Sequence, residues 1–417
     1  MLAKSVTMFR TSCLLASLVP VSLAQEIIFE WNYLNFSWQS ANVYEQAVSD
    51  KSYIPENNII SGIKVNRDRV YLTLPRWKNG VPATLVSIAR TTEQKTPLLE
   101  PYPNWDMQKL DDCSALQYVQ SMEIDPASRM WILENGRTEF LSDNPRSKCP
   151  ARLIILDLLN DGQVLLDYQF PADVARRDSV ILDDIVLDHE DGGWAYITDF
   201  DAEYPGIIVF SLRNRTSWKV THPRSMRSSD EAREFRVEGT TFQLDGAVDG
   251  IALSPASASG DRTLYYSPLS SFELFSLPVS ALRSRHLAGE IDEYVETVGK
   301  KSSQTDGMQI SATGVLYYGQ LGESAVDQYD TLAAPSSFAD DRRVFYRSSE
   351  LNQWPDSFSM CDKGWLWWTS NRKQNFLGGN VDLDSPNYRV IAKEASGKSY
   401  QYFEDGTHPE LPTIADE

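Results

Sequence analysis

The feature that most constrains the fold is a two-strand phrase that recurs six times along the 417-residue chain. Each copy begins with an alternating apolar strand, makes a short turn and returns through a strand that carries an aromatic residue. The aromatic residues of successive copies lie 50 to 69 residues apart. Repeats of this length, with period-2 strands and turn-rich connections, are typical of a β-propeller. The six copies occupy residues 61–75, 120–135, 183–200, 249–269, 306–321 and 356–371.

The repeat predicts an all-β fold, a six-bladed β-propeller with four strands in each blade. A β-sandwich is the alternative, since sandwiches also consist of short alternating strands. Gly and Pro are scattered through the connections rather than gathered in a linker. We therefore expect residues 25–417 to form one domain, whose N- and C-terminal segments extend around the propeller or close its ring.

The N-terminus has the pattern of a targeting segment. Two basic residues precede the apolar run 13–23, and a small-x-small triplet at 22–24 overlaps the end of that run. This pattern predicts a secretory signal peptide over residues 1–24 and a secreted, extracellular protein. A buried N-terminal strand is the alternative interpretation. No other apolar stretch reaches the roughly 18 residues that a membrane span needs.

Three cysteines remain after such a leader. Cys113 and Cys149 are predicted to form a disulfide within one stretch of chain. Cys361 is then left over, either buried and inert or paired between chains, and its apolar surroundings favour burial. Asn35 and Asn214 lie in N-glycosylation sequons, which fits the secretory route.

The charge of the chain limits its partners. The formal net charge is −19 at pH 7. Such acidity argues against nucleic acids and anionic membrane surfaces as partners. It favours cationic small molecules or metal ions. The oligomeric state is left open.

Aligning the six copies places four carboxylates at one register, at the entry to the first strand of a blade. In a propeller this strand lines the central channel, so the residues are expected to form a ring at one mouth. Like charges held that close raise at least one pKa or recruit a cation. The alternatives are ordinary turn chemistry for Asp before Gly, contact with an organic ligand, or a metal site. The aligned residues are Ser61, Gln120, Asp183, Asp249, Asp306 and Asp356.

Several longer phrases resemble the major royal jelly protein and Yellow family. The resemblance implies a secreted six-bladed propeller, in agreement with the repeat count. Members of the family include melanin-pathway proteins credited with dopachrome conversion, salivary binders of biogenic amines and royal-jelly nutrient proteins. The fold can be transferred from such a resemblance, whereas the function must be argued from the site. The phrases lie at 53–63, 74–85, 112–136, 149–158, 266–283 and 370–372.

The same resemblance singles out one position near the channel. Asn371 matches the Asn of a Ser-Asn-basic phrase that contributes to the ligand site of amine-binding relatives. Lys373 stands where those relatives have an aromatic residue. This exchange argues against the same amine pocket.

Familiar catalytic sets are missing from the sequence. The chain has four His, of which His189 and His222 are expected in surface loops. No pair of His has the spacing of a helical zinc site, and the sequence holds no P-loop, dinucleotide fingerprint or nucleophile elbow. The sequence therefore implies no cofactor, and no metal ligand is assigned.

Three functions fit these residues. The first is an isomerase-type enzyme that binds a small aromatic or quinonoid metabolite at the channel and promotes its isomerisation or cyclisation without a cofactor. Asp249 and Asp306 are the predicted bases. The second is a non-catalytic carrier of biogenic amines or aromatic metabolites, and the third is a metal-dependent hydrolase that uses the acid ring. The predicted ligand-binding residues are Gln120, Asp183, Asp356 and Asn371.

Overall fold

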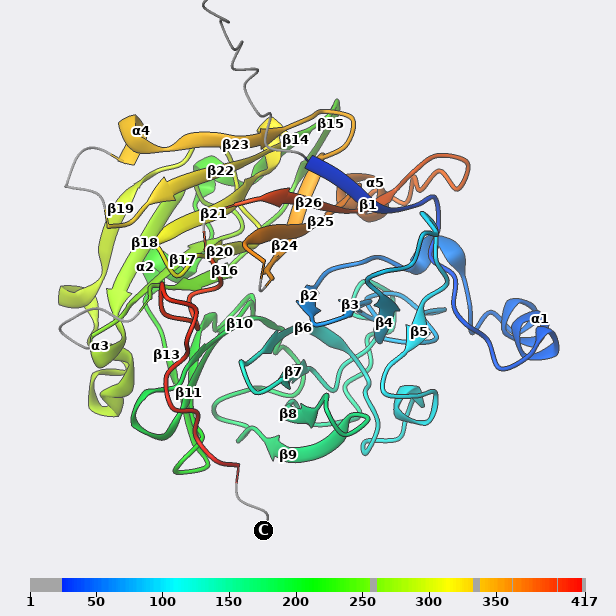
Figure 1. Ribbon diagram of the computed structural model, residues 1–417, viewed down its shortest axis with the longest axis horizontal. Coiled ribbons are helices and arrows are strands. Elements are labelled where there is room, and N and C mark those ends of the chain that lie inside the picture. Colours follow the sequence, from blue (N-terminus) through cyan, green and yellow to red (C-terminus); the bar gives the residue numbers. More distant parts are fainter. Residues whose placement is uncertain (1–24, 256–260, 333–337, 362, 396, 415–417) are drawn as a thin grey trace, which may run out of the picture.

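A computed structural model describes residues 25–255, 261–332, 338–361, 363–395 and 397–414. The predicted signal peptide, residues 1–24, lies outside the described residues. Within the described ranges, six four-stranded antiparallel sheets form the blades of a six-bladed β-propeller. Figure 1 shows the blades arranged around a common centre. The predicted fold class is confirmed.

Each blade contains four strands, which are named in order from the channel outward. Blade 1 holds β2 (Ile63–Asn66), β3 (Arg69–Thr73), β4 (Leu85–Ala89) and β5 (Glu100–Pro101). Blade 2 holds β6 (Val119–Ile124), β7 (Arg129–Glu134), β8 (Arg152–Asp157) and β9 (Gln163–Gln169). Blade 3 holds β10 (Leu182–Asp188), β11 (Trp194–Asp199), β12 (Gly206–Ser211) and β13 (Thr216–Val220).

The second half of the ring follows the same plan. Blade 4 holds β16 (Val248–Leu253), β17 (Thr263–Pro268), β18 (Glu273–Pro278) and β19 (Glu296–Lys300). Blade 5 holds β20 (Met308–Ile310), β21 (Val315–Gln320), β22 (Ala325–Asp330) and β23 (Arg343–Arg347). Blade 6 holds β24 (Trp354–Met360), β25 (Trp365–Asn371), β26 (Tyr388–Glu394) and β1 (Gln25–Trp31). The six sequence phrases thus correspond to the two innermost strands of each blade.

The N-terminal strand closes the ring. β1 pairs antiparallel with β26, so that Trp31 lies opposite Tyr388, and this makes it the outermost strand of blade 6. Figure 1 shows the two strands side by side although they come from opposite ends of the chain. β1 therefore completes the sheet of blade 6.

Helices are few and lie in the connections. α1 (Ala41–Ser49) projects from the rim near blade 1 (Figure 1), and α5 (Lys373–Leu377) follows β25. A two-stranded hairpin joins blades 3 and 4. In the part of the chain that the structure describes, no helix is long and apolar enough to cross a membrane. The remaining elements are α2 (Pro223–Met226), α3 (Val279–Arg283), α4 (Phe338–Asp341), β14 (Glu234–Val237) and β15 (Thr240–Gln243).

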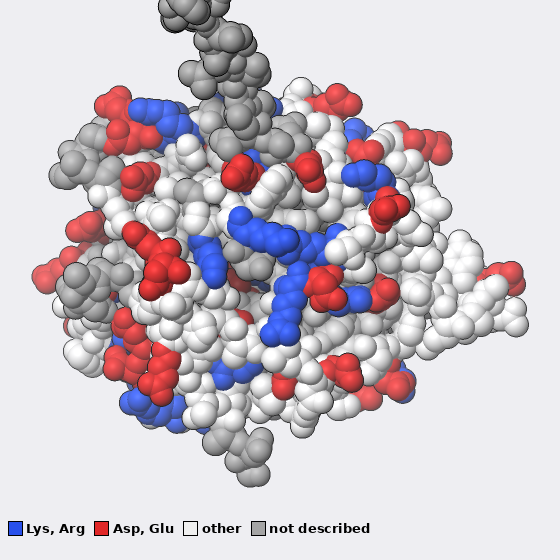
Figure 2. Space-filling model, viewed as in Figure 1, with Lys and Arg blue, Asp and Glu red and all other residues white. Residues whose placement is uncertain are grey.

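Side chains alternate between the two faces of each strand, and the apolar ones fill the space between the blades. Tyr317 and Trp367, which the repeat aligns, are buried in this core, and Tyr265 is partly buried against it. Acidic side chains are scattered over the face shown in Figure 2, whereas several basic side chains gather near its centre. Outside the channel, the carboxylates visible on this face are thus spread over solvent-exposed surface.

The structure contains the predicted disulfide. Cys113 and Cys149 are bonded, with 5.4 Å between their Cα atoms. Cys361 is buried and has a free thiol. Of the two sequon residues, Asn214 is exposed in the turn between β12 and β13, and Asn35 is half-buried.

Candidate functional site

The aligned polar residues meet at one point of the channel. All six line the same narrow space at the entry to the inner strands. In four blades the pairing between the first and second strands shifts at this position, as between Leu182 and Ile185 in β10. Such a bulge re-aims the side chains it contains. The common register seen in the sequence therefore coincides with a backbone irregularity in four of the six blades.

Glycines let the inner strands approach each other at this level. A Cβ on Gly250 would lie 2.1 Å from the carbonyl oxygen of Asp306, and one on Gly307 would lie 2.2 Å from that of Asp356. No side chain fits at such distances, since backbone cannot retreat as a flexible side chain does. The Asp-Gly pairs, which also suit ordinary turns, here mark close contact between neighbouring blades.

A lysine ammonium lies among the carboxylates. The Nζ of Lys373 is 2.8 Å from Oδ2 of Asp306 and 2.9 Å from Oδ2 of Asp356. The indole Nε1 of Trp354 also donates to Oδ2 of Asp306, over 2.7 Å. The same ammonium lies 5.3 Å from the ring centre of Trp77 and 5.4 Å from that of Trp354. Lys373 is thus enclosed by two carboxylates and two indole rings.

A directed hydrogen-bond chain reaches the other two carboxyls. Trp77 Nε1 can only donate, and it donates to the hydroxyl of Tyr118 over 2.8 Å. That hydroxyl donates to Oε1 of Gln120 over 2.7 Å, which points the Gln120 amide nitrogen toward Oδ1 of Asp183 at 2.8 Å. Asp183 is in turn hydrogen-bonded to Asp249. The Asp183–Asp249 hydrogen bond lowers the pKa of Asp183 and raises that of Asp249, which favours Asp183 as the acceptor and Asp249 as the group that carries the proton.

Burial and mutual repulsion shift the acidity of the ring. Burial, together with the carboxylates of Asp306 and Asp184, raises the pKa of Asp183 to about 7. Burial and the carboxylates of Asp183 and Asp306 raise the pKa of Asp249 well above its usual range. Burial alone would lower the pKa of Lys373, but the carboxylates of Asp306 and Asp356 outweigh it and raise that pKa. At neutral pH the ring therefore holds a fixed cation beside a carboxyl pair that can exchange a proton.

A cavity with apolar walls lies over this carboxyl pair. Its volume is about 100 Å³, and its polar lining consists of Gln120, Asp183, Asp249 and Lys373, with the hydroxyl of Tyr118 beside them. The walls come from connecting loops of five blades and are aromatic or aliphatic. A few convergent polar groups within apolar walls are typical of a small-molecule site. The wall residues are Trp77, Tyr118, Phe140, Leu141, Ile181, Phe200, Leu244, Leu269 and Leu377.

Two basic residues hold the loops that carry the site. Arg76 is 2% exposed, and its guanidinium donates to five backbone carbonyls, among them those of Val81 and Leu116. This fixes the loop that presents Trp77. Lys78 donates to the carbonyl oxygen of Phe376 over 2.9 Å and ties the same loop to α5, whose first residue is Lys373.

The remaining predicted residues lie nearby but face the protein. Asn371 Nδ2 donates to Asp356 Oδ2 over 2.7 Å and to the carbonyl of Ile60, and its Oδ1 accepts from the backbone N–H of Lys373. Asp306 and Asp356 line the narrow ring beneath the apolar cavity. The structure therefore brings all the predicted ring residues together, and the apolar cavity meets three of them, Gln120, Asp183 and Asp249.

The two histidines expected in surface loops are buried, so that prediction was wrong. His189 is 5% exposed and its Nε2 lies 2.9 Å from Oε1 of Gln401. His222 is 7% exposed, and its Nε2 lies 2.9 Å from Oδ1 of Asp292. The C-terminal segment covers the ring of His189, and the loop that carries Asp292 covers the ring of His222. The pattern of apolar and polar residues within single strands does not reveal such coverage by distant segments.

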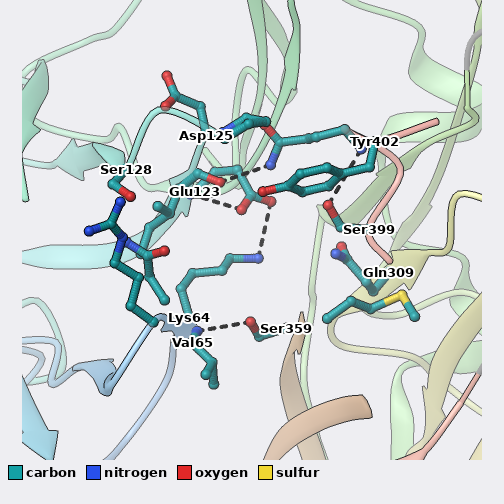
Figure 3. A pocket seen from close by; sticks show the side chains of 15 residues that line it. Lys64, Val65, Glu123, Asp125, Ser128, Gln309, Ser359, Ser399 and Tyr402 are labelled. Carbon is teal, nitrogen blue, oxygen red and sulfur yellow. Dashed lines mark hydrogen bonds and ion pairs between the residues drawn. The ribbon is translucent and has the colours of Figure 1, made fainter. Parts of the chain in front are cut away.

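A second, polar cavity occupies the opposite end of the channel. Its volume is about 180 Å³, and the buried ion pair of Lys64 and Glu123, 3.2 Å apart, lies on its lining. Figure 3 shows Ser399 and Tyr402 of the C-terminal segment across the cavity from Lys64. Tyr400 anchors this segment by a backbone hydrogen bond to Ile310. The C-terminal segment thus covers part of this mouth, so the apolar cavity is the better candidate for ligand binding.

The ring does not fit a divalent metal ion. Among the described residues, no three carboxylate, imidazole or thiolate side chains are arranged to hold one. The position between Asp306 and Asp356 is taken by the ammonium of Lys373. A cation there would have to displace a tethered charge of the same sign.

Comparison with known proteins agrees with this architecture. A family model described as "Major royal jelly protein" matches residues 117–399. The chain belongs to the major royal jelly protein family.

Named relatives are distant but match most of the chain. The chain is similar to dopaminechrome tautomerase of Drosophila melanogaster, with 28% identity over 88% of this chain and 81% of the relative. It is also similar to protein yellow of Drosophila yakuba, with 27% identity over 87% and 67%. Major royal jelly protein 1 of Apis mellifera is 24% identical over 88% and 86%.

Solved structures support the fold alone. A gluconolactonase candidate aligns with a TM-score of 0.50 and 10% identity, over 91% of this chain and 94% of its own. Identity this low carries no information about the reaction.

Proposed function

We propose that this protein binds a small quinonoid aromatic in the apolar cavity and catalyses its tautomerisation without a cofactor. The observation that carries the proposal is the hydrogen-bonded pair Asp183 and Asp249 at the floor of an aromatic-walled cavity. A carboxyl pair that exchanges a proton near neutral pH suits general acid–base catalysis. The similarity to dopaminechrome tautomerase supports the same reaction class.

The proposed reaction shifts two protons from ring carbons to the two carbonyl oxygens and exchanges no electrons between molecules. The ionised carboxylate of Asp183 removes a proton from a saturated ring carbon that is conjugated through a C=C bond to a carbonyl, so a C–H bond breaks. The carbonyl oxygen gains a proton from the Asp249 carboxyl, so an O–H bond forms and a quinone methide results. The proton then passes from Asp183 to Asp249, and a second transfer from the neighbouring carbon to the other carbonyl oxygen makes the ring aromatic. The ammonium of Lys373 stabilises the negative charge that develops on the first carbonyl oxygen.

The geometry changes the assignment of the base. The sequence suggests Asp249 and Asp306, but Asp306 accepts hydrogen bonds from Lys373 and Trp354. Asp306 also lines the narrow ring and not the apolar cavity, so it does not face a substrate bound there. We therefore assign the acid–base pair to Asp183 and Asp249 and treat Asp306 as the partner of Lys373.

The test is a direct assay with an aminochrome, whose visible absorbance falls as the dihydroxyindole forms. Wild-type protein should accelerate this loss above the spontaneous rate, and the variants Asp183→Asn and Asp249→Asn should each lower kcat by about 100-fold or more. Gln309→Ala in the polar cavity is the matched control and should keep wild-type activity. Wild-type activity in both Asn variants contradicts the assignment of the base. If wild-type protein binds the aminochrome tightly but does not convert it, the result supports a non-catalytic carrier instead.

We also infer that the protein is secreted and glycosylated. The leader-like residues 1–24, the disulfide between Cys113 and Cys149, and the exposed sequon at Asn214 support this route. Expression in insect cells tests it: processed protein should accumulate in the medium with its N-terminus at residue 25.

A further inference from the structure

Lys373 occupies the position in which the ring would hold a ligand ammonium. A cationic nitrogen is recognised by carboxylate oxygens and by the faces of indole rings. Lys373 has both, with Asp306 and Asp356 within 2.9 Å and the rings of Trp77 and Trp354 within 5.4 Å. The side chain is 8% exposed. A complete cation site is therefore present, and the chain itself fills it.

Hydrogen bonds at both ends of α5 hold Lys373, and with it the ammonium, in place. The backbone N–H of Lys373 donates to Oδ1 of Asn371 over 2.9 Å, which starts α5 directly after β25. Lys78 fixes the other end of α5 through the carbonyl of Phe376. A tethered group competes with a free ligand at a high effective concentration, so an external amine has to displace a cation that cannot diffuse away.

Most of the negative charge of the ring is already compensated. Lys373 pairs with Asp306 and Asp356, and Asp183 and Asp249 are hydrogen-bonded to each other, so that the pair carries at most one negative charge while Asp249 holds its proton. A ligand ammonium in the apolar cavity would lie close to the ammonium of Lys373, because Lys373 contributes to the lining of that cavity. Like charges in such a buried place repel strongly.

The ammonium of Lys373 suits a ligand oxygen instead. It has three N–H donors, and two of them are accounted for by carboxylates among the described residues. A carbonyl, phenolate or carboxylate oxygen in the cavity accepts the third.

We propose that Lys373 determines ligand specificity at this site: it excludes aromatic amines and selects small aromatics whose polar end is a neutral or anionic oxygen. The inference rests on the proposed function only in taking the apolar cavity as the binding site. It names the substrate class as aromatics without an ammonium group, and it assigns no catalytic step.

Calorimetry with two matched probes tests the inference without turnover. Tyramine and 4-hydroxyphenylacetate share a phenol ring and differ in the charge of the side chain. Wild-type protein should bind 4-hydroxyphenylacetate at least about tenfold more tightly than tyramine. The variant Lys373→Met, similar in length and uncharged, should reverse this order. Lys373→Arg should preserve it, because the positive charge remains.

Several results overturn the inference. The first is equal or tighter binding of tyramine than of 4-hydroxyphenylacetate by wild-type protein, a comparison that does not depend on the folding of a variant. The second is a Lys373→Met protein that melts cooperatively and still binds 4-hydroxyphenylacetate more tightly than tyramine. The third is that wild-type protein binds neither probe. Aminochrome turnover by wild-type protein separates the two proposals: turnover without the expected preference for 4-hydroxyphenylacetate refutes only the role of Lys373, whereas that preference without turnover refutes only the tautomerase.

Discussion

The Nζ of Lys373 lies 2.8 Å from Oδ2 of Asp306, which joins the first residue of α5 to the entry of blade 5. Both side chains are 8% exposed, so the pair is removed from water. Removing one partner of such a pair leaves an uncompensated buried charge. The pair therefore determines the charge state of the whole ring, and through it the chemistry available at the cavity floor.

The acid pair predicts how stability depends on pH. Burial raises the pKa of Asp183 to about 7 and that of Asp249 above its usual range, whereas both carboxyls ionise near pH 4 when unfolded. The folded state therefore binds more protons between these values, and the free energy of unfolding falls as pH rises from about 4 toward 7. Each extra proton that the folded state binds lowers the free energy of unfolding by about 1.4 kcal/mol for every unit of pH increase in this range.

Thermal melting at several pH values checks this dependence. The double variant Asp183→Asn/Asp249→Asn should lose less stability than wild type between pH 5 and 7, because its amides do not ionise. Asp356, whose pKa burial and Asp306 raise to about 8, is present in both proteins and cancels in the comparison. Parallel profiles for the two proteins would show that these carboxyls do not titrate in this range.

The site illustrates which parts of a propeller a single sequence predicts. The ring residues Asp183 and Asp249 were identified because every blade repeats the same two-strand phrase, so the register survives in the sequence. Lys373 and Trp77 lie in the connections between the second and third strands of blades 6 and 1, and these connections differ in length and sequence from blade to blade. Their positions depend on loop anchors such as Arg76, whose partners are backbone carbonyls that leave no sequence pattern. The inner ring was predictable for this reason, and the walls and the tethered cation were not.

The disulfide predicts a measurable loss of stability when it is removed. Cys113 and Cys149 are 36 residues apart and restrict the loops before β6 and after β7, which carry part of the cavity wall. The variant Cys113→Ser/Cys149→Ser should lower the free energy of unfolding by about 2–4 kcal/mol. Urea unfolding measures this, and wild-type protein without reductant is the reference. An unchanged midpoint would mean that the cross-link adds nothing to the folded ring.

The two sequons should differ in occupancy. Asn214 is exposed in a turn, whereas Oδ1 of Asn35 accepts hydrogen bonds from the N–H of Phe36 and from Nε1 of Trp38. We expect a glycan on Asn214 in protein recovered from the medium, and little on Asn35. Peptide mass spectrometry decides, with Asn214→Gln as the control that should remove the modification. Modification of Asn35 with Asn214 bare would contradict the prediction.

Ring closure by β1 should contribute strongly to stability. Trp31 is 1% exposed and its Nε1 donates to the carbonyl oxygen of Pro97 over 2.9 Å. Trp31→Ala should lower the free energy of unfolding by about 3–5 kcal/mol, because it leaves a large cavity at the closing sheet. Tyr33→Ala, at a residue 42% exposed, is the control and should change it by less than about 0.5 kcal/mol. Similar losses for both variants would refute a special role for Trp31.

The pairing of β1 with β26 also bears on how the protein is made in the cell. The strand Gln25–Trp31 leaves the ribosome long before its partner Tyr388–Glu394, so blade 6 cannot be completed until almost the whole chain has been translated. Until then β1 has no partner, and once β26 emerges, its outer edge is a template for aberrant pairing with other chains. Production of this protein is therefore expected to be sensitive to chaperone supply and to premature termination near the 3′ end of its message.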